Sequence, residues 1–153
     1  MSEQHKYYME QALELAREAG ERDEVPIGAV LVRDNEIIGR GYNQPIASHD
    51  PTAHAEILAL REAAERCSNY RLPGSILYVT IEPCTMCVGA LIHARVQQLV
   101  FGAREPRAGV VVSQQHLLAQ GFYNHAVAVT EGVLAEKSAA LLQDFFAARR
   151  VAR

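Results

Sequence analysis

Two short stretches, thirty residues apart, most constrain what this chain can fold into. They are His54-Ala55-Glu56 and Pro83-Cys84-Thr85-Met86-Cys87. One imidazole and two thiols can hold a metal ion, and three protein ligands leave the fourth position of a tetrahedral zinc site open. The remaining cysteine, Cys67, lies outside both stretches, and we expect it to be a buried apolar residue. The fold must therefore bring the two stretches side by side.

Hydrophobic periodicity and turn signals predict an alternation of helices and strands. Helices are expected over 4–19, 52–66, 84–94 and 134–150, and strands over 25–33, 37–42, 75–80, 98–103 and 126–130. Residues 104–124 are interpreted as loop with room for a short helix. This order predicts a single domain over 1–153, of the α/β class, with three α/β/α layers and a central mixed five-stranded sheet. Gly28 leaves room for the close approach of another group, for which a ligand is one candidate.

Composition narrows the class of protein. The 153 residues are enough for one core, and three cysteines are too few for a secreted disulfide framework. No apolar run is long enough for a membrane span or a signal peptide, which predicts a cytoplasmic protein. The net charge of −3 disfavours strong non-specific binding to nucleic acids. Arg149 and Arg150 form a local basic end, which is interpreted equally well as a solvated helix terminus or as a polyanion contact.

Each of the two stretches begins a predicted helix, where free backbone N–H groups and the helix dipole favour the thiolates that bind metal. Two thiolates and an imidazole suit zinc better than calcium or magnesium. If Glu56 is not a fourth ligand, it can take a proton from water and pass it to a substrate nitrogen. Residues two apart do not share a helix face, so His54 and Glu56 must converge from the first turn. A thioredoxin-like redox pair at Cys84 and Cys87 is the alternative.

Beyond these motifs, the sequence resembles the TadA-type tRNA adenosine deaminases of the cytidine deaminase superfamily. The resemblance is carried by Glu24–Val30, Asp50–Ile57, Tyr70–Leu72, Leu77–Cys84, Phe101–Arg104, Asn124-His125, Thr130–Gly132 and Leu141–Arg150. It implies a cytidine deaminase-like fold, zinc held by His54, Cys84 and Cys87, and Glu56 as proton shuttle. The implied reaction is hydrolytic deamination of adenosine to inosine at the wobble position of a tRNA anticodon, by attack of zinc-bound hydroxide on C6. Anticodon bases are unpaired, so an enzyme can extract one at low cost.

The resemblance also implies residues that bind the substrate. Asn43 matches a base-contacting asparagine, although a turn residue would look the same, and Val25 matches an apolar pocket wall or a generic strand residue. Phe146, Arg149 and Arg150 match a carboxy-terminal helix that lines the RNA groove, where ordinary helix packing explains the phenylalanine equally well.

One loop departs from the resemblance. Glu105, followed by Pro106, stands where the family usually has an aspartate, in a loop that approaches the RNA backbone and sugar. The resemblance implies a homodimer with one Zn²⁺ per subunit and the tRNA anticodon stem-loop as partner, with no membrane partner. A deaminase of free cytosine, guanine or their nucleosides and a non-catalytic RNA-binding protein with structural zinc are the competing functions.

Overall fold

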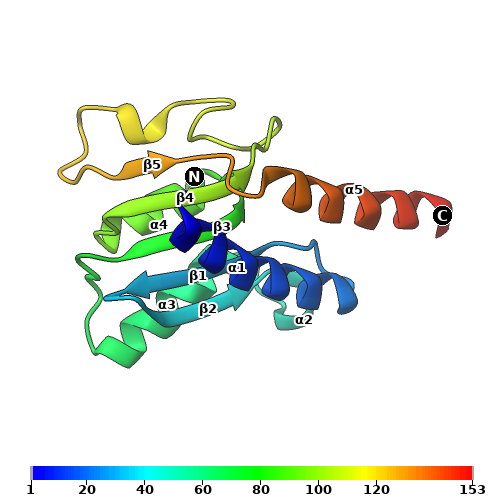
Figure 1. Ribbon diagram of the computed structural model, residues 1–153, viewed down its shortest axis with the longest axis horizontal. Coiled ribbons are helices and arrows are strands. Elements are labelled where there is room, and N and C mark those ends of the chain that lie inside the picture. Colours follow the sequence, from blue (N-terminus) through cyan, green and yellow to red (C-terminus); the bar gives the residue numbers. More distant parts are fainter. Residues whose placement is uncertain (1, 153) are drawn as a thin grey trace.

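A mixed sheet of five strands organises the computed structural model, which describes residues 2–152 (Figure 1). The strands are β1 (Gly28–Arg33), β2 (Glu36–Tyr42), β3 (Ile76–Ile81), β4 (Gln98–Ala103) and β5 (Ala128–Thr130), in the order β2-β1-β3-β4-β5. Strand β1 runs antiparallel to β2 and β3, whereas β3, β4 and β5 are parallel. The predicted fold class is confirmed.

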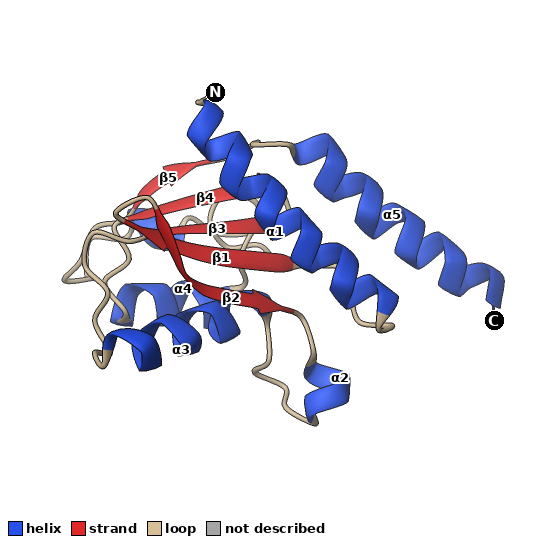
Figure 2. Cartoon of the chain, turned by 60° about the horizontal axis from the view of Figure 1, so that its bottom comes forward, coloured by secondary structure: helices blue, strands red, loops and turns tan. Residues whose placement is uncertain are grey.

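Helices cover both faces of this sheet. They are α1 (Glu3–Glu21), α2 (Pro45–Ser48), α3 (Ala55–Cys67), α4 (Thr85–His93) and α5 (Ala135–Ala152), with a short 3-10 turn η1 (Leu117–Ala119). Helices α1 and α5 lie on one face, and α3 and α4 lie on the other (Figure 2). None of the helices in residues 2–152 is long and apolar enough to cross a membrane.

The central strands contribute side chains to two hydrophobic cores, because successive side chains of a strand point to opposite faces of the sheet. Leu31, Leu77 and Phe101 pack on the side of α3 and α4. Val30 and Tyr78 pack with residues of α1 on the other side. Burial on both faces explains why these strands read as continuous apolar runs in the sequence.

Two glycines let helix backbones lie directly on the sheet. A Cβ atom on Gly28 would lie 2.1 Å from the carbonyl oxygen of Ala12 in α1. A Cβ atom on Gly41 would lie 2.2 Å from the carbonyl oxygen of Ala55 in α3. The close approach expected at Gly28 is therefore made by a helix and not by a ligand, and Gly41 seats the first turn of α3.

Several predicted boundaries shift, each for a local reason. Strand β1 begins at Gly28 and not at Val25, since Pro26 has no N–H to donate and the N–H of Ile27 bonds back to the carbonyl of Val25. The N-cap of helix α3 is His54, two residues after the predicted Thr52, so the helix begins at Ala55. Between the predicted strand 37–42 and the predicted helix 52–66, where no element was expected, lies the short helix α2.

Candidate metal centre

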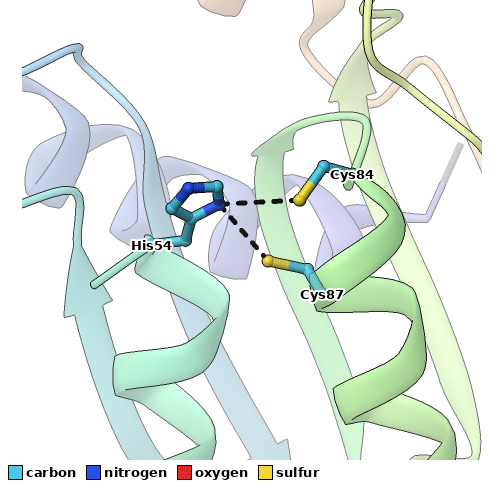
Figure 3. Close-up of side chains that lie close together, drawn as sticks. All are labelled: His54, Cys84 and Cys87. Carbon is cyan, nitrogen blue, oxygen red and sulfur yellow. Dashed lines mark hydrogen bonds between the residues drawn. The ribbon is translucent and has the colours of Figure 1, made fainter. Parts of the chain in front are cut away.

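The amino-terminal ends of α3 and α4 bring the two motifs together (Figure 3). His54 and Cys84 are the N-cap residues of these helices, both in extended conformation, and neither side chain caps its own helix. Cys87 lies on the first turn of α4 and is buried. Freed from capping, the imidazole and both sulfur atoms point into the space between the two helix ends.

The spacing of these three side chains matches a zinc site. The Nδ1 atom of His54 lies 3.6 Å from the Sγ atom of Cys84 and 3.6 Å from that of Cys87. All three atoms lie within 4.8 Å of one another. A tetrahedral ion with Zn–N and Zn–S bonds of standard length requires an N-to-S edge of about 3.6 Å. The donor set and its dimensions therefore fit Zn²⁺ with a fourth position left open.

Glu56 completes this centre from the first turn of α3. Its side chain is 3% exposed, and its charge helps to raise the pKa of Cys87. Because His54 precedes the helix in extended conformation, the two side chains can converge although they are two residues apart. The three groups that could hold a metal come from His54, Cys84 and Cys87, so the carboxylate of Glu56 is an additional group beside them.

The electrostatics of the centre favour a bound cation, because one of the two thiols ionises readily. Hydrogen bonding from Cys87 lowers the pKa of the Cys84 thiol to about 3, with His54 acting in the same direction against the effect of burial. The hydrogen bond to Cys84, burial and the charge of Glu56 raise the pKa of Cys87. Burial also raises the pKa of Glu56. A dication would remove the second thiol proton, since metal binding releases protons from its ligands.

Asn43 lies beside the metal centre, directly after β2. Its side-chain oxygen accepts a hydrogen bond of 2.8 Å from the N–H of Ala55, and its own N–H donates to the carbonyl of Ile27. The side chain is 7% exposed. These bonds leave the amide nitrogen of its side chain available to a ligand. Asn43 therefore orients the first turn of α3 and is more than a turn residue.

The other predicted substrate-binding residues meet in one groove of about 720 Å³, which we call the loop–α5 groove. Its lining includes Val25, Glu105, Phe146, Arg149 and Arg150. It also includes Ile81, two positions before Pro83 in the sequence, so its wall leads towards the Cys84 turn. The structure thus gathers these residues on one surface.

The two arginines of α5 differ in their environment. Arg149 donates a hydrogen bond of 2.7 Å to the carbonyl of Asp23, and its guanidinium lies 4.1 Å from the ring centre of Phe145. Arg150 makes no ion pair with a carboxylate among the described residues. Phe146 is 44% exposed and packs edge-on against Phe145 of the same helix. Arg150 and Phe146 are the freer groups for a ligand.

The sequence prediction missed three residues of this region. Arg107 lines the loop–α5 groove. Glu24 is buried, and its carboxylate accepts N–H bonds from Ile46 and Ala47 of α2. Glu82 is buried at the end of β3. A carboxylate directly before Pro83, at the end of an apolar strand, was the available sequence signal for Glu82.

Comparison with known proteins identifies the class of this fold and centre. The family model for the cytidine and deoxycytidylate deaminase zinc-binding region matches residues 2–103. The chain is also similar to a guanine deaminase from Nitrosomonas europaea, with a TM-score of 0.81 and 28% identity over 93% of this chain and 84% of that one. These matches define a zinc-dependent deaminase.

Nearer relatives share a narrower activity. The tRNA-specific adenosine deaminase of Haemophilus influenzae is 51% identical over 97% of this chain and 87% of its own length. That of Agrobacterium fabrum is 48% identical, covering 95% of both. A solved structure from studies of A-to-I editing by tRNA:A34 deaminases at the wobble position of transfer RNA has a TM-score of 0.86 and 48% identity, covering 89% of this chain and 99% of that one. The chain belongs to the tRNA-specific adenosine deaminase family.

Proposed function

We propose that this protein converts adenosine to inosine at the wobble position of a tRNA anticodon by hydrolysis. One observation carries the proposal: a His54–Cys84–Cys87 cluster of zinc-site dimensions, with a buried carboxylate beside it. The wobble position is supported by the similarity to the solved structure described in terms of tRNA:A34 deaminases. We further propose one Zn²⁺ in each chain.

Zinc bound by these residues would lower the pKa of a water molecule in its open position to about 7 and so supply a nucleophile at neutral pH. Glu56 would take one proton from the attacking water and donate it to a ring nitrogen of the base. It would then take the second proton from the hydroxyl group added to C6 and pass it to the amine, so that the oxygen becomes the carbonyl of inosine and the amine leaves as ammonia. Burial of Glu56 suits this role, because a raised pKa brings a carboxylate nearer to working as both base and acid at neutral pH.

Asn43 and Val25 would hold the adenine base. The amide nitrogen of Asn43 is available to a base acceptor, while its oxygen is committed to the N–H of Ala55. Val25 is partly buried and lines the loop–α5 groove, so it can offer an apolar surface to a nucleotide. An anticodon base needs no unpairing before it enters such a pocket.

The loop–α5 groove would hold the RNA strand that flanks the base. Its lining carries Arg104, Arg107, Arg149 and Arg150 but only one carboxylate, that of Glu105. Arg104 is paired in bidentate fashion with Glu131, and Arg149 is held by Asp23. Arg107 and Arg150 therefore remain for phosphates, and Phe146 can stack on a base.

We propose that a second copy of the chain binds the face of the molecule formed by α3 and α4, opposite to the face covered by α1 and α5. Between α3 and α4 lies an apolar groove of about 440 Å³, lined by Leu60, Leu72 and Met86 among others. Tyr70 at its edge is 71% exposed. A homodimer would bury these side chains and join two basic grooves, which helps an acidic chain to bind a polyanion. Sedimentation of the wild type and of Tyr70→Asp tests this, since the variant should be a monomer.

Mass spectrometry of anticodon stem-loops incubated with the zinc-loaded protein tests the reaction. Inosine at the first anticodon position is the expected product, and adenosine at other positions should remain. Matched incubations with free guanine, cytosine and their nucleosides test the competing function. Activity on free bases, with none on any stem-loop of the host, would instead assign the protein to the free-base deaminases.

A further inference from the structure

The buried carboxylate of Glu82 accepts hydrogen bonds from several backbone N–H groups of a loop that is distant in the sequence. The residue is 2% exposed and follows the last residue of β3. The N–H of Glu105 donates to one oxygen at 3.0 Å. The N–H groups of Val111, Val112 and Ser113 donate to the other at 3.0, 2.9 and 3.0 Å. The hydroxyl of Ser113 also donates to the carboxylate.

No cationic side chain forms an ion pair with Glu82 among the described residues. Its charge is met by N–H groups of residues 105–113, which we call the groove loop. The loop is fitted closely to this group: a Cβ atom on Gly109 would lie 2.4 Å from the carboxyl carbon of Glu82. The N–H of Val110 also donates to the carbonyl of Pro83.

The groove loop reaches the surface on its other side. Glu105, Pro106 and Arg107 line the loop–α5 groove, together with Phe146 and Arg150 of α5. Glu82 itself stands two residues before Cys84, and its N–H donates to the carbonyl of Ala103 in β4. One residue therefore joins the Cys84 turn, the end of β4 and the wall of the groove, the last of these through its side chain.

We propose that Glu82 is a positioning residue that fixes the groove loop relative to the metal centre, so that an RNA strand in the groove presents its base in register. The inference deepens the proposed function and rests on it. Glu82 is not one of the three residues that could hold a metal, and it does not line the loop–α5 groove. It acts through the backbone of Glu105 and through the loop that carries Arg107.

A carboxylate is needed at this position because every group facing it is a donor. Glutamine keeps the length but offers one accepting oxygen, and its NH₂ group would meet N–H donors. The buried donors left unpaired would drive the loop to a different arrangement. The loop would then place Arg107 and Glu105 differently against the RNA, while the three metal-ligating side chains keep their positions on α3 and α4.

The test compares Glu82→Gln with Glu62→Gln in the zinc-loaded protein. Glu62 is a matched control because its exposed carboxylate accepts an N–H bond from Arg40, far from the groove. Hydrogen exchange should become about 10- to 100-fold faster over residues 105–113 in Glu82→Gln alone. On an anticodon stem-loop, KM should rise about tenfold while kcat falls less than about threefold. Zinc content should stay at one ion per chain.

Three results would overturn the proposal: unchanged exchange in the groove loop, faster exchange with an unchanged KM, or loss of zinc. The last would mean that Glu82 serves the metal-ligand turn. Should Glu82→Gln fail to fold, Ser113→Ala removes one donor and should give smaller shifts of the same sign, whose absence would refute the role. A wild type without activity on stem-loops would refute the proposed function, whereas exchange would still decide whether Glu82 holds the loop.

Discussion

Replacing Glu56 by glutamine separates proton transfer from metal binding. The side chain keeps its shape, and burying a neutral amide costs less than burying a carboxylate, so the melting temperature should not fall. Glutamine cannot carry the proton from water to the base. General acid–base catalysis contributes about 10²- to 10⁴-fold for a proton transfer.

The surroundings of Glu56 place the loss near the top of this range. At 3% exposure, bulk water and buffer cannot replace it. The other buried carboxylates among the described residues, those of Glu24 and Glu82, are already engaged by backbone N–H groups. We expect kcat to fall about 10³- to 10⁴-fold, or about 4–5.5 kcal/mol of transition-state stabilisation.

Single-turnover formation of inosine, followed by mass spectrometry, measures this loss. Metal analysis should find one zinc per chain in both the wild type and Glu56→Gln. Glu62→Gln serves as a control that changes an exposed carboxylate only. A Glu56→Gln enzyme that kept more than about a tenth of the wild-type rate would refute the proton-shuttle role.

Three further predictions test the metal centre and the fold around it. Chelation of the metal should abolish inosine formation and lower the melting temperature. The number of thiols that titrate under native conditions should rise from one, that of Cys67, to three, with Cys84 and Cys87 added. An unchanged number of titrating thiols would contradict the ligand set. Gly41→Ala should lower the free energy of unfolding by about 3 kcal/mol, because the new Cβ atom would meet the carbonyl of Ala55. Gly89→Ala, in open space on α4, should not lower it. Urea titration of both variants measures these changes. Burial raises the pKa of Tyr78 to about 12 from an ordinary 10. The stability that this residue contributes is therefore fully present below pH 10 and is lost as the pH rises towards 12. Thermal melts should show this loss in the wild type, and the loss should be absent in Tyr78→Phe.

Much of the architecture followed from local patterns. Apolar runs such as that of β4 were predicted at their observed bounds, because strands buried on both faces leave a continuous signal. The start of β1 was predicted three residues early, since a run of apolar residues does not reveal where a ladder of hydrogen bonds begins. Helix α2 was missed because a single turn has no periodicity to detect.

The candidate site divides in the same way. Residue type and spacing alone identified His54, Cys84 and Cys87 as a candidate donor set and Glu56 as its carboxylate, since metal preference depends on the donor atoms. The carboxy-terminal arginines were found as a local basic end, and the resemblance implied that they line an RNA groove. Only the structure distinguished Arg149, held by Asp23 and Phe145, from Arg150.

The sequence by itself determined the chemistry available to this protein, because donor atoms and a proton-carrying group are properties of individual residues. The tertiary structure decided how those groups meet. Extended backbone at His54 and Cys84 makes two N-cap residues candidate ligands, with the Nδ1 and Sγ atoms 3.6 Å apart. The carboxylate of Glu82 accepts N–H bonds from the groove loop, whose residues are more than twenty positions away in the sequence. Contacts of this range depend on sheet order and helix placement, which no local pattern encodes.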